Sequence, residues 1–325
     1  MEFYNDIKQE IIQKELSDNA SKSAFLAGIF KVLGSVHIAK GCVNLQLDIE
    51  DCTLATQVVL YLKQIYNAPF EVSFGKSKPD KERLYTIDVM PNLTEKIASN
   101  LYCIEYQDNV AVRFIDGIEY PFSNIDQKIA YLRAIFLALG KVYVPRKEEK
   151  NSGYHFEMIF THEKLAEDVA NLFKGFNINV KILERNEGET YNVYLKESEA
   201  ICDLCALLGA SEAVLSLNNI IIERQMTNMA NRQTNCSMAN ISKIVEAGQK
   251  QLMAINFIEK TVGLDCLDDK LKEIALIRKE NPDFSLEQIA EEMENPIGKS
   301  GINHRFRKLM ELAESLEKRG TNGRN

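Results

Sequence analysis

The sequence predicts an α+β protein in which one αββαββα unit occurs twice and a separate all-α domain follows. Two observations indicate this. The stretch FLAGIFKVLGSV at residues 25–36 returns in register as YLRAIFLALGKV at residues 131–142, and the elements expected after each stretch come in the same order. From about residue 216 onward, strand-like patterns end and helix-like patterns replace them. A repeated order of elements is typical of a duplicated structural unit.

Each copy begins with its repeated helix and continues through four strands and two further helices. The first copy contains a strand pair that ends at VNLQLDIE, the helix LATQVVLYLKQIY, the strands FEVSF and LYTIDV, and the helix LTEKIASNLYC. The second contains YHFEMIF, KLAEDVANLFKGF, NVKIL, YNVYL and ESEAICDLCALLGA in the same roles. Near-alternation with β-branched and aromatic residues favours the strands. We expect an N-terminal helix in residues 1–20, the first copy in 21–105 and the second in 106–215.

The two repeated helices are apolar nearly all round, which indicates that they are buried. Ala27 and Gly28 in the first helix correspond to Arg133 and Ala134 in the second, so one side of each is mostly small. We therefore expect the helices to approach closely across a pseudo-twofold axis. The alternative is two unrelated core helices whose small residues coincide by chance.

Composition leaves the function open but narrows the class of protein. The chain has 325 residues, enough for two or three domains, and a formal net charge of −8. Its apolar runs are too short to span a membrane. The stretch MEFYNDIKQEIIQKEL is polar and unlike an export signal, and the seven cysteines have no framework spacing. We expect a cytoplasmic, nucleoid-associated protein without membrane contact.

No pattern in the sequence indicates a cofactor or a metal site. Cys202 and Cys205 form a C-x-x-C pair, but they lie in an apolar helix without a second pair or a nearby histidine. Because a structural zinc site needs four ligands, core packing is the favoured interpretation. We expect no metal and no cofactor.

Residues 216–262 predict a polar, helical linker. There is no Asp or Glu between Arg224 and Val245, whereas Arg224, Arg232 and Lys243 are basic and several asparagines accompany them. Guanidinium, ammonium and amide groups suit the DNA backbone. These three residues are candidate DNA contacts. The alternative is an interdomain helix with a solvated surface.

Residues 263–320 predict a helix-turn-helix domain of three helices. The first, DKLKEIALIRKE, ends before Pro282, and the second, SLEQIAEEM, begins with a capping box of Ser285 and Gln288. Phe284 and Ile289 occupy the hydrophobic-staple positions around that cap. The third helix, expected at residues 300–318 with Ser300 as its cap, has an apolar stripe of Ile302, Phe306, Leu309, Ala313 and Leu316.

The other face of the third helix predicts contact with DNA. No acid occurs between residues 295 and 310, while acids crowd the helices on either side. The first turns of a recognition helix enter the major groove, where Arg pairs with guanine and Asn with adenine. The expected base-reading residues are Asn303, His304, Arg307 and Lys308. The expected phosphate contacts are Lys299, Ser300 and Arg305. The alternative is a solvated basic helix in an ordinary three-helix bundle.

The repeated helices resemble those of the LAGLIDADG homing endonucleases, a fold of two αββαββα halves joined through paired helices. In active members, an acid directly before the last glycine of each helix binds the divalent metals that activate water. The matching positions hold Leu33 and Leu139, and the other usually acidic position holds Lys31 and Leu137. Since leucine binds no metal, the resemblance implies a scaffold and not an enzyme. Residual metal-dependent cleavage is the competing hypothesis.

A degenerate LAGLIDADG repeat followed by this domain resembles the WhiA family of bacterial regulators over nearly the whole chain. The most specific segments are GKSGINHRFRKLMELAE, NCSMANISK, YLKESEAICDLCALLGA and FLAGIF. The resemblance implies a transcription regulator of sporulation, cell division or chromosome segregation, whose C-terminal domain reads double-stranded promoter DNA and cooperates with sigma-bearing RNA polymerase. Arg133 and the acidic total charge depart from the family pattern. The alternative is an adaptor for a sigma factor or RNA polymerase, with secondary DNA contact.

Overall fold

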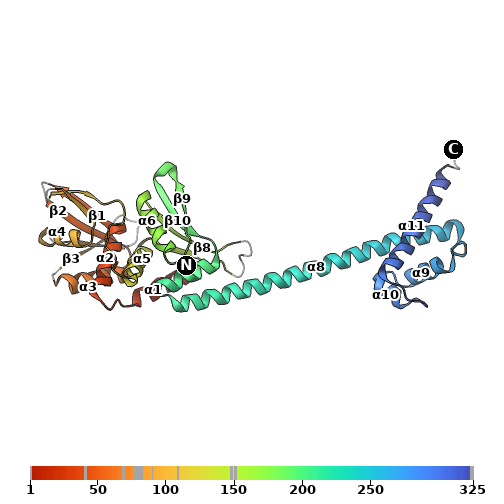
Figure 1. The fold of residues 1–325 in the computed structure, drawn as a ribbon. Helices are drawn as coiled ribbons and strands as arrows, with labels where there is room; N and C mark the ends of the chain where they lie inside the picture. Colours follow the sequence, from red (N-terminus) through yellow and green to blue (C-terminus); the bar gives the residue numbers. More distant parts are fainter. Residues whose placement is uncertain are drawn as a thin grey trace. The chain divides into compact units, whose positions relative to one another are not determined.

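The structure is a computed structural model that describes residues 2–39, 42–67, 70–76, 83–89, 91–107, 110–146, 149 and 152–322. The chain divides into two compact units, Met1–Arg224 (unit 1) and Gln225–Asn325 (unit 2). Each unit has a hydrophobic core. Unit 1 combines helices with sheets, and unit 2 is helical (Figure 1). Within the described residues, no helix has both the length and the hydropathy to span a bilayer.

Unit 1 contains the αββαββα order twice, as predicted. The first copy consists of α2 (Asn19–Leu33), β1 (Gly34–Ala39), β2 (Cys42–Ile49), α3 (Cys52–Tyr66), β3 (Glu71–Lys76), β4 (Arg83–Val89) and α4 (Pro91–Asn100). The second consists of α5 (Ile125–Leu139), β7 (Lys141–Tyr143), β8 (His155–Phe160), α6 (Glu163–Lys174), β9 (Lys181–Arg185), β10 (Thr190–Leu195) and α7 (Ser198–Leu208). A short 3-10 helix, η1 (Asn186–Gly188), joins β9 to β10. The predicted α+β fold class is confirmed.

The two four-stranded sheets have the same topology. Their strand orders are β1-β2-β4-β3 and β7-β8-β10-β9, and all neighbouring strands are antiparallel. In β8, Phe156, Met158 and Phe160 alternate with more exposed residues and turn toward the core. A two-stranded hairpin of β5 (Ile104–Gln107) and β6 (Val110–Phe114) lies between the copies in sequence. The sequence pattern had not indicated this hairpin.

The helices α2 and α5 pack side by side in the centre of unit 1 (Figure 1). A Cβ atom added at Gly28 would lie 2.8 Å from the Tyr131 carbonyl oxygen and 2.9 Å from the Ala134 Cβ, so the helices can approach this closely only with glycine there. Arg133 does not enter this contact. Its Nε donates a hydrogen bond of 2.7 Å to the Leu208 carbonyl at the end of α7. This explains how a large residue is accommodated where a small one was expected.

The N-terminal helix α1 (Glu2–Gln13) is shorter than the predicted range of residues 1–20, because α2 already begins at Asn19 behind its cap Asp18. Ile7, Ile11 and Ile12 bury α1 in the core of unit 1. The Glu10 carboxylate accepts hydrogen bonds from the backbone N–H groups of Glu212 and Ala213, at 2.9 and 3.1 Å. These are unsatisfied donors of the first turn of the next helix, so α1 caps that helix from outside.

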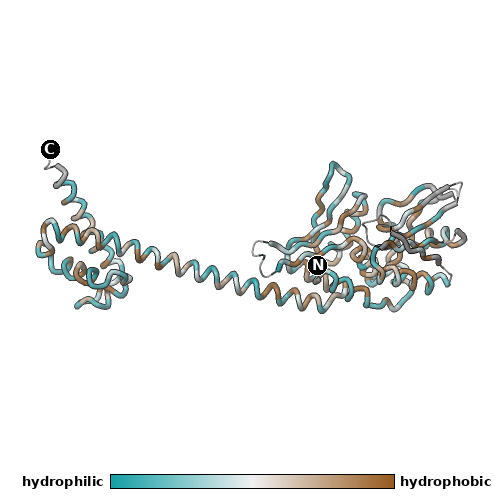
Figure 2. Tube along the Cα trace, turned by 180° about the vertical axis from the view of Figure 1, so that it is seen from behind, coloured by the Kyte–Doolittle hydropathy of each residue, from teal (hydrophilic) through white to brown (hydrophobic). Residues whose placement is uncertain are grey.

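The helix α8 (Ser211–Val262) has 52 residues and confirms that the predicted linker is helical. It begins before the expected boundary at residue 216 and crosses the boundary between the two units. From residue 225 to residue 243 every side chain is exposed. This middle part of α8 is coloured mostly in the hydrophilic half of the scale or near its centre (Figure 2). Residues 225–243 are called the exposed segment of α8 below.

Unit 2 contains the last part of α8, a 3-10 helix η2 (Leu264–Cys266), and the helices α9 (Asp269–Glu280), α10 (Leu286–Glu291) and α11 (Lys299–Asn322). The three predicted helices and the Ser285–Gln288 capping box are confirmed. Ile255 and Ile258 of α8 are fully buried in the same core as α9, α10 and α11. The C-terminal part of the predicted linker is therefore a fourth helix of this domain.

Candidate nucleic-acid interface

Helix α11 has one buried face and one exposed face, as the sequence predicts. The buried stripe consists of Ile302, Phe306, Leu309 and Ala313, with Leu316 partly buried against the same core. The predicted base-reading side chains, Asn303, His304, Arg307 and Lys308, are all exposed. Since they recur at helical spacing opposite the stripe, the structure gathers all four on one surface.

The start of α11 corrects the expected cap. The helix begins at Lys299, and the Gly298 carbonyl accepts hydrogen bonds from Gly301 N–H at 2.9 Å and Ile302 N–H at 3.2 Å. Gly298 therefore takes the cap position, and Ser300 lies inside the first turn. The proline and glycine before the helix let the chain turn there without a side-chain cap. Lys299 and Ser300 still occupy the positively polarised end of the helix, where an anion is favoured.

Arg307 lies between two neighbours on its own helix. Its Nη2 is 3.0 Å from Nδ1 of His304, which accepts the hydrogen bond when the ring proton is on Nε2. Its Nε is 3.8 Å from a carboxylate oxygen of Glu311. All three side chains are exposed. The guanidinium is thus oriented along the exposed face of α11 before any ligand is present.

Lys299 and Arg305 differ in how the domain engages them. Lys299 Nζ lies 2.5 Å from a carboxylate oxygen of Glu287 on α10, and both side chains are well exposed. Arg305 is largely covered: its Nη1 donates to the Lys270 carbonyl at 3.4 Å and lies 3.7 Å from the Glu273 carboxylate. A phosphate could replace Glu287 at Lys299 with little rearrangement. At Arg305 it would have to displace contacts that hold α11 against α9.

The three linker candidates also separate into two kinds. Arg224 Nη2 donates to the carbonyls of Glu149 and Ser152, at 3.3 and 2.9 Å, and its guanidinium lies over the Tyr154 ring. It anchors α8 to unit 1. Arg232 and Lys243 are exposed on the exposed segment of α8. Among the three candidates, Arg232 and Lys243 therefore present their charge to solvent, whereas Arg224 is held by unit 1.

Arg278 positions this surface, and the sequence pattern did not single it out. It is 1% exposed, and its Nη1 donates to the carbonyls of Pro282 and Phe284 at 3.1 and 2.7 Å. Its guanidinium carbon lies 5.2 Å from the centroid of the Phe306 ring on α11. Burial lowers the pKa of Arg278, because removal from water disfavours the charged form. The available signal was an arginine at the end of an amphipathic helix, just before a proline-containing turn.

Glycine at position 248 completes the arrangement around Arg278. A Cβ atom at Gly248 would lie 2.8 Å from the Pro282 carbonyl oxygen and 3.6 Å from Arg278 Nη1. The turn between α9 and α10 therefore packs directly on the backbone of α8. A glycine inside a helix destabilises it by about 1 kcal/mol relative to alanine, so the close approach offers a physical reason for it.

Helix α1 lies against the end of α5, one of the two paired helices of unit 1. The Tyr4 hydroxyl donates a hydrogen bond to the Gly140 carbonyl, directly after Leu139. Burial raises the pKa of Tyr4 to about 12. A cavity of about 720 Å³ beside this contact is lined in part by Leu33, Leu137 and Lys8. Across the described residues, no group of three or more His, Cys, Asp or Glu side chains is placed to hold a metal ion.

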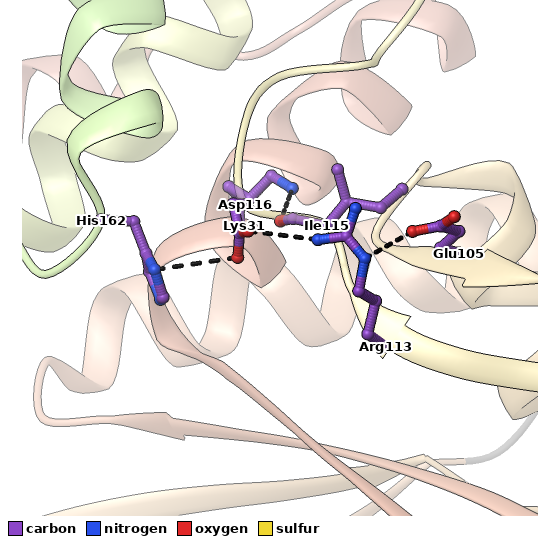
Figure 3. Close-up of polar contacts among 6 residues, drawn as sticks. All are labelled: Lys31, Glu105, Arg113, Ile115, Asp116 and His162. Atoms are coloured by element: carbon purple, nitrogen blue, oxygen red, sulfur yellow. Dashed lines mark hydrogen bonds and ion pairs between the residues drawn. The ribbon is translucent and has the colours of Figure 1, made fainter.

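Lys31 has a structural contact at the other position where active endonucleases usually carry an acid. Its Nζ donates to the Ile115 carbonyl at 2.7 Å (Figure 3). The same Nζ lies 5.0 Å from the Phe114 ring centroid. Burial lowers the pKa of Lys31. The next residue, Asp116, pairs with Arg113 and His162. Lys31 thus ties α2 to the segment between the two copies.

Cys202 and Cys205 pack in the core, as predicted. Both thiols are buried, and burial raises the pKa of Cys205 to about 12. A thiol that holds its proton so firmly is a poor nucleophile and a poor metal ligand.

The fold and the surface of α11 define a protein that joins a duplicated LAGLIDADG-like domain to a separate helix-turn-helix domain. Family models match all three parts of the chain: the WhiA N-terminal LAGLIDADG-like domain at residues 19–103, the WhiA LAGLIDADG-like domain at residues 128–227 and the WhiA C-terminal HTH domain at residues 230–313. The chain belongs to the WhiA family.

Curated relatives match over almost their whole length. The "Probable cell division protein WhiA" of Thermoanaerobacter sp. (strain X514) is 33% identical over 323 residues, which cover 98% of this chain and 99% of the relative. The protein of the same name from Staphylococcus haemolyticus (strain JCSC1435) is 33% identical, with 97% of this chain and 98% of the relative covered. The crystal structure of full-length DUF199/WhiA from Thermatoga maritima shares the fold, with a TM-score of 0.57 at 22% identity, covering 96% of this chain and 98% of that one.

Proposed function

We propose that this chain is a sequence-specific DNA-binding transcription regulator of the WhiA type, in which α11 reads base edges in the major groove of promoter DNA. The observation that carries the proposal is the exposed face of α11, where Asn303, His304, Arg307 and Lys308 stand together. No acid interrupts residues 295–310. Arg307 is suited to a guanine edge and Asn303 to an adenine edge. Lys299 and Ser300 at the helix start are suited to phosphate.

The biological setting follows from the family. The relatives named above are called probable cell division proteins, and we propose a role in cell division, chromosome segregation or sporulation for this chain as well. A DNA-binding regulator of this kind acts at the nucleoid in the cytoplasm. Arg232 and Lys243 on α8 are proposed as additional contacts to the DNA backbone, whereas Arg224 and Arg305 are held by contacts within the protein.

We further propose that unit 1 is not a nuclease. Leu33 and Leu139 replace the acids that would bind divalent metals, and α1 lies against the end of α5 through Tyr4. Failure to nick supercoiled plasmid in the presence of magnesium is the expected result. Nicking that disappears when Asp48 or Glu50, beside Leu33, is replaced would contradict this proposal.

Selection from genomic DNA tests the base-reading assignment. The full-length chain is incubated with sheared genomic DNA near physiological salt, and the retained fragments are sequenced. Arg307→Ala is expected to cost about 1–3 kcal/mol at the enriched site and to relax the preference at one base pair. Lys299→Ala is expected to weaken binding to all sequences alike. It should also reduce the slope of log affinity against log salt concentration by about one. Unchanged binding by both variants would remove α11 from the interface.

An adaptor that brings a sigma factor or RNA polymerase to DNA is the second candidate. Its support is the charge of unit 1, which holds 24 Lys and Arg against 32 Asp and Glu. An acidic domain is better suited to a basic protein surface than to the DNA backbone. If residues 1–224 capture no polymerase component, the adaptor function fails for unit 1.

A further inference from the structure

Two basic side chains of α11 that we assign to DNA contact, Arg307 and Lys299, have acidic neighbours. Glu311, one turn after Arg307, lies 3.8 Å from its Nε, and Glu287 on α10 lies 2.5 Å from Lys299 Nζ. All four side chains are more than half exposed. Ion pairs so exposed add little to folding stability, because water screens them and two long side chains must be ordered. Folding alone therefore gives a weak reason for acids at these two positions.

Each acidic neighbour changes how strongly the basic side chain attracts a DNA phosphate relative to a base edge. Non-specific binding depends almost entirely on contacts with phosphates, whereas specific binding adds contacts with base edges. A carboxylate repels a phosphate that approaches within about 8–10 Å at ordinary salt. A guanine edge presents neutral acceptors in the major groove and meets much less repulsion.

We infer that Glu311 is a specificity-determining residue of the α11 interface, which limits the use of Arg307 on phosphate and orients it for a base edge. The inference rests on the proposed function of α11. Glu311 attracts the Nε side of the guanidinium, and His304 accepts from Nη2 when its ring proton is on Nε2. These two contacts involve Nε and Nη2 and do not involve Nη1. Nη1 and the second N–H of Nη2 can then donate to a bidentate acceptor, and the attraction of Arg307 for an isolated phosphate is partly cancelled.

Glu287 has a different effect on binding, because its partner Lys299 is assigned to phosphate in every complex. Removing Glu287 frees Lys299 for specific and non-specific DNA alike. Removing Glu311 frees Arg307 mainly for non-specific DNA, since in the specific complex Arg307 is already engaged with a base. Replacing Glu287 and replacing Glu311 should therefore change the ratio of specific to non-specific affinity differently.

The test compares Glu311→Gln with Glu314→Gln and Glu287→Gln in the full-length chain. Glu314 is exposed on the same helix but is not paired with Arg307, so its replacement makes the same charge change without the contact. Binding is measured by fluorescence anisotropy on the enriched duplex and on a scrambled duplex of equal length. One additional uncompensated positive charge is worth about fivefold in affinity for DNA near 0.15 M salt.

Glu311→Gln is expected to bind the scrambled duplex about fivefold more tightly and the enriched duplex with little gain, so that the specificity ratio falls about fivefold. Glu287→Gln should bind both duplexes more tightly and leave the specificity ratio unchanged. If Glu311→Gln changes the ratio no more than Glu314→Gln, the inference is wrong even though α11 reads DNA. If Arg307→Ala also leaves the ratio unchanged, the proposed function of α11 fails, and the inference fails with it.

Discussion

At the scale of single residues, Arg278 and Gly248 hold the exposed surface of α11 in place although neither is part of it. The buried guanidinium of Arg278 donates to backbone carbonyls and lies over the Phe306 ring, so it joins the turn after α9 to α11. Gly248 lets that turn rest on α8. Phe306 directly precedes Arg307 in the sequence. The position of the proposed base-reading residues thus depends on a contact on the opposite side of their helix.

Replacing Arg278 with alanine tests this dependence. The change leaves the carbonyls of Pro282 and Phe284 without their donor and opens a cavity beside Phe306, which together should cost about 3–5 kcal/mol. For a domain of this size, each kcal/mol lost lowers the melting temperature by about 4–8 °C. Calorimetry of the full-length chain should therefore show the melting temperature of unit 2 lowered by more than about 10 °C. Lys279→Ala, which removes a more exposed lysine paired with Glu259, should lower it by only a few degrees. Equal shifts in the two variants would contradict a special role for Arg278.

The residues of α11 could be predicted, whereas Arg278 and Gly248 could not, for one physical reason. The stripe from Ile302 to Ala313 depends on the period of a helix, which the sequence displays directly. The partners of Arg278 are backbone carbonyls in the following turn, and the partner of Gly248 is a carbonyl more than thirty residues away in sequence. Side-chain periodicity carries no information about such carbonyls.

At the scale of elements, α8 is held at both ends and exposed between them. Glu10 caps its first turn and Arg224 anchors it to unit 1, while Gly248 and Ile255 pack in unit 2. Between residues 225 and 243 no side chain is buried. Most helix stability in proteins comes from packing of one face, and the exposed segment of α8 buries no face. The exposed segment of α8 should therefore open locally more often than its two ends.

Limited proteolysis with trypsin tests this expectation. The first cuts should fall after Arg232 and Lys243, since local opening at low free energy exposes the backbone there. Arg224 should resist cleavage, because its side chain holds the carbonyls of Glu149 and Ser152. Mass spectrometry of the early fragments gives the order of the cuts. A first cut within α11 or in the region before residue 224 would show that the exposed segment of α8 is not the least stable part of the chain.

The elements of unit 1 could mostly be predicted, because the copies confirm each other. Strand alternation in one copy supports the weaker pattern in the other, and both sheets have the same strand order. The early start of α8 at Ser211 was missed, since its cap comes from Glu10, about two hundred residues earlier in the chain. The hairpin of β5 and β6 was missed because its strands are short and belong to neither repeat.

At the scale of the whole molecule, the charge is divided unequally between the units. Unit 1 contains 24 Lys and Arg and 32 Asp and Glu, so that it accounts for the entire net charge of −8. Unit 2 contains 15 of each and is neutral, with its acids outside residues 225–245 and 295–310. The acidic total is therefore compatible with DNA binding by unit 2. It also means that unit 1, taken alone, carries a net negative charge, which disfavours DNA binding.

This division predicts how the isolated unit 2 will bind. Residues 225–325, which have their own core, should bind the enriched duplex at least as tightly as the full-length chain, because the acidic unit is gone. The gain in affinity of the fragment over the full-length chain should be largest near 0.01 M salt, where charges act over about 30 Å. It should fade at 0.15 M salt, where charges act over about 8 Å. Anisotropy titrations of both proteins across this salt range measure it, with circular dichroism to verify that the fragment is helical. If the folded fragment binds more weakly at every salt concentration, unit 1 contributes favourable DNA contacts despite its charge, and these contacts should then be sought on its basic side chains.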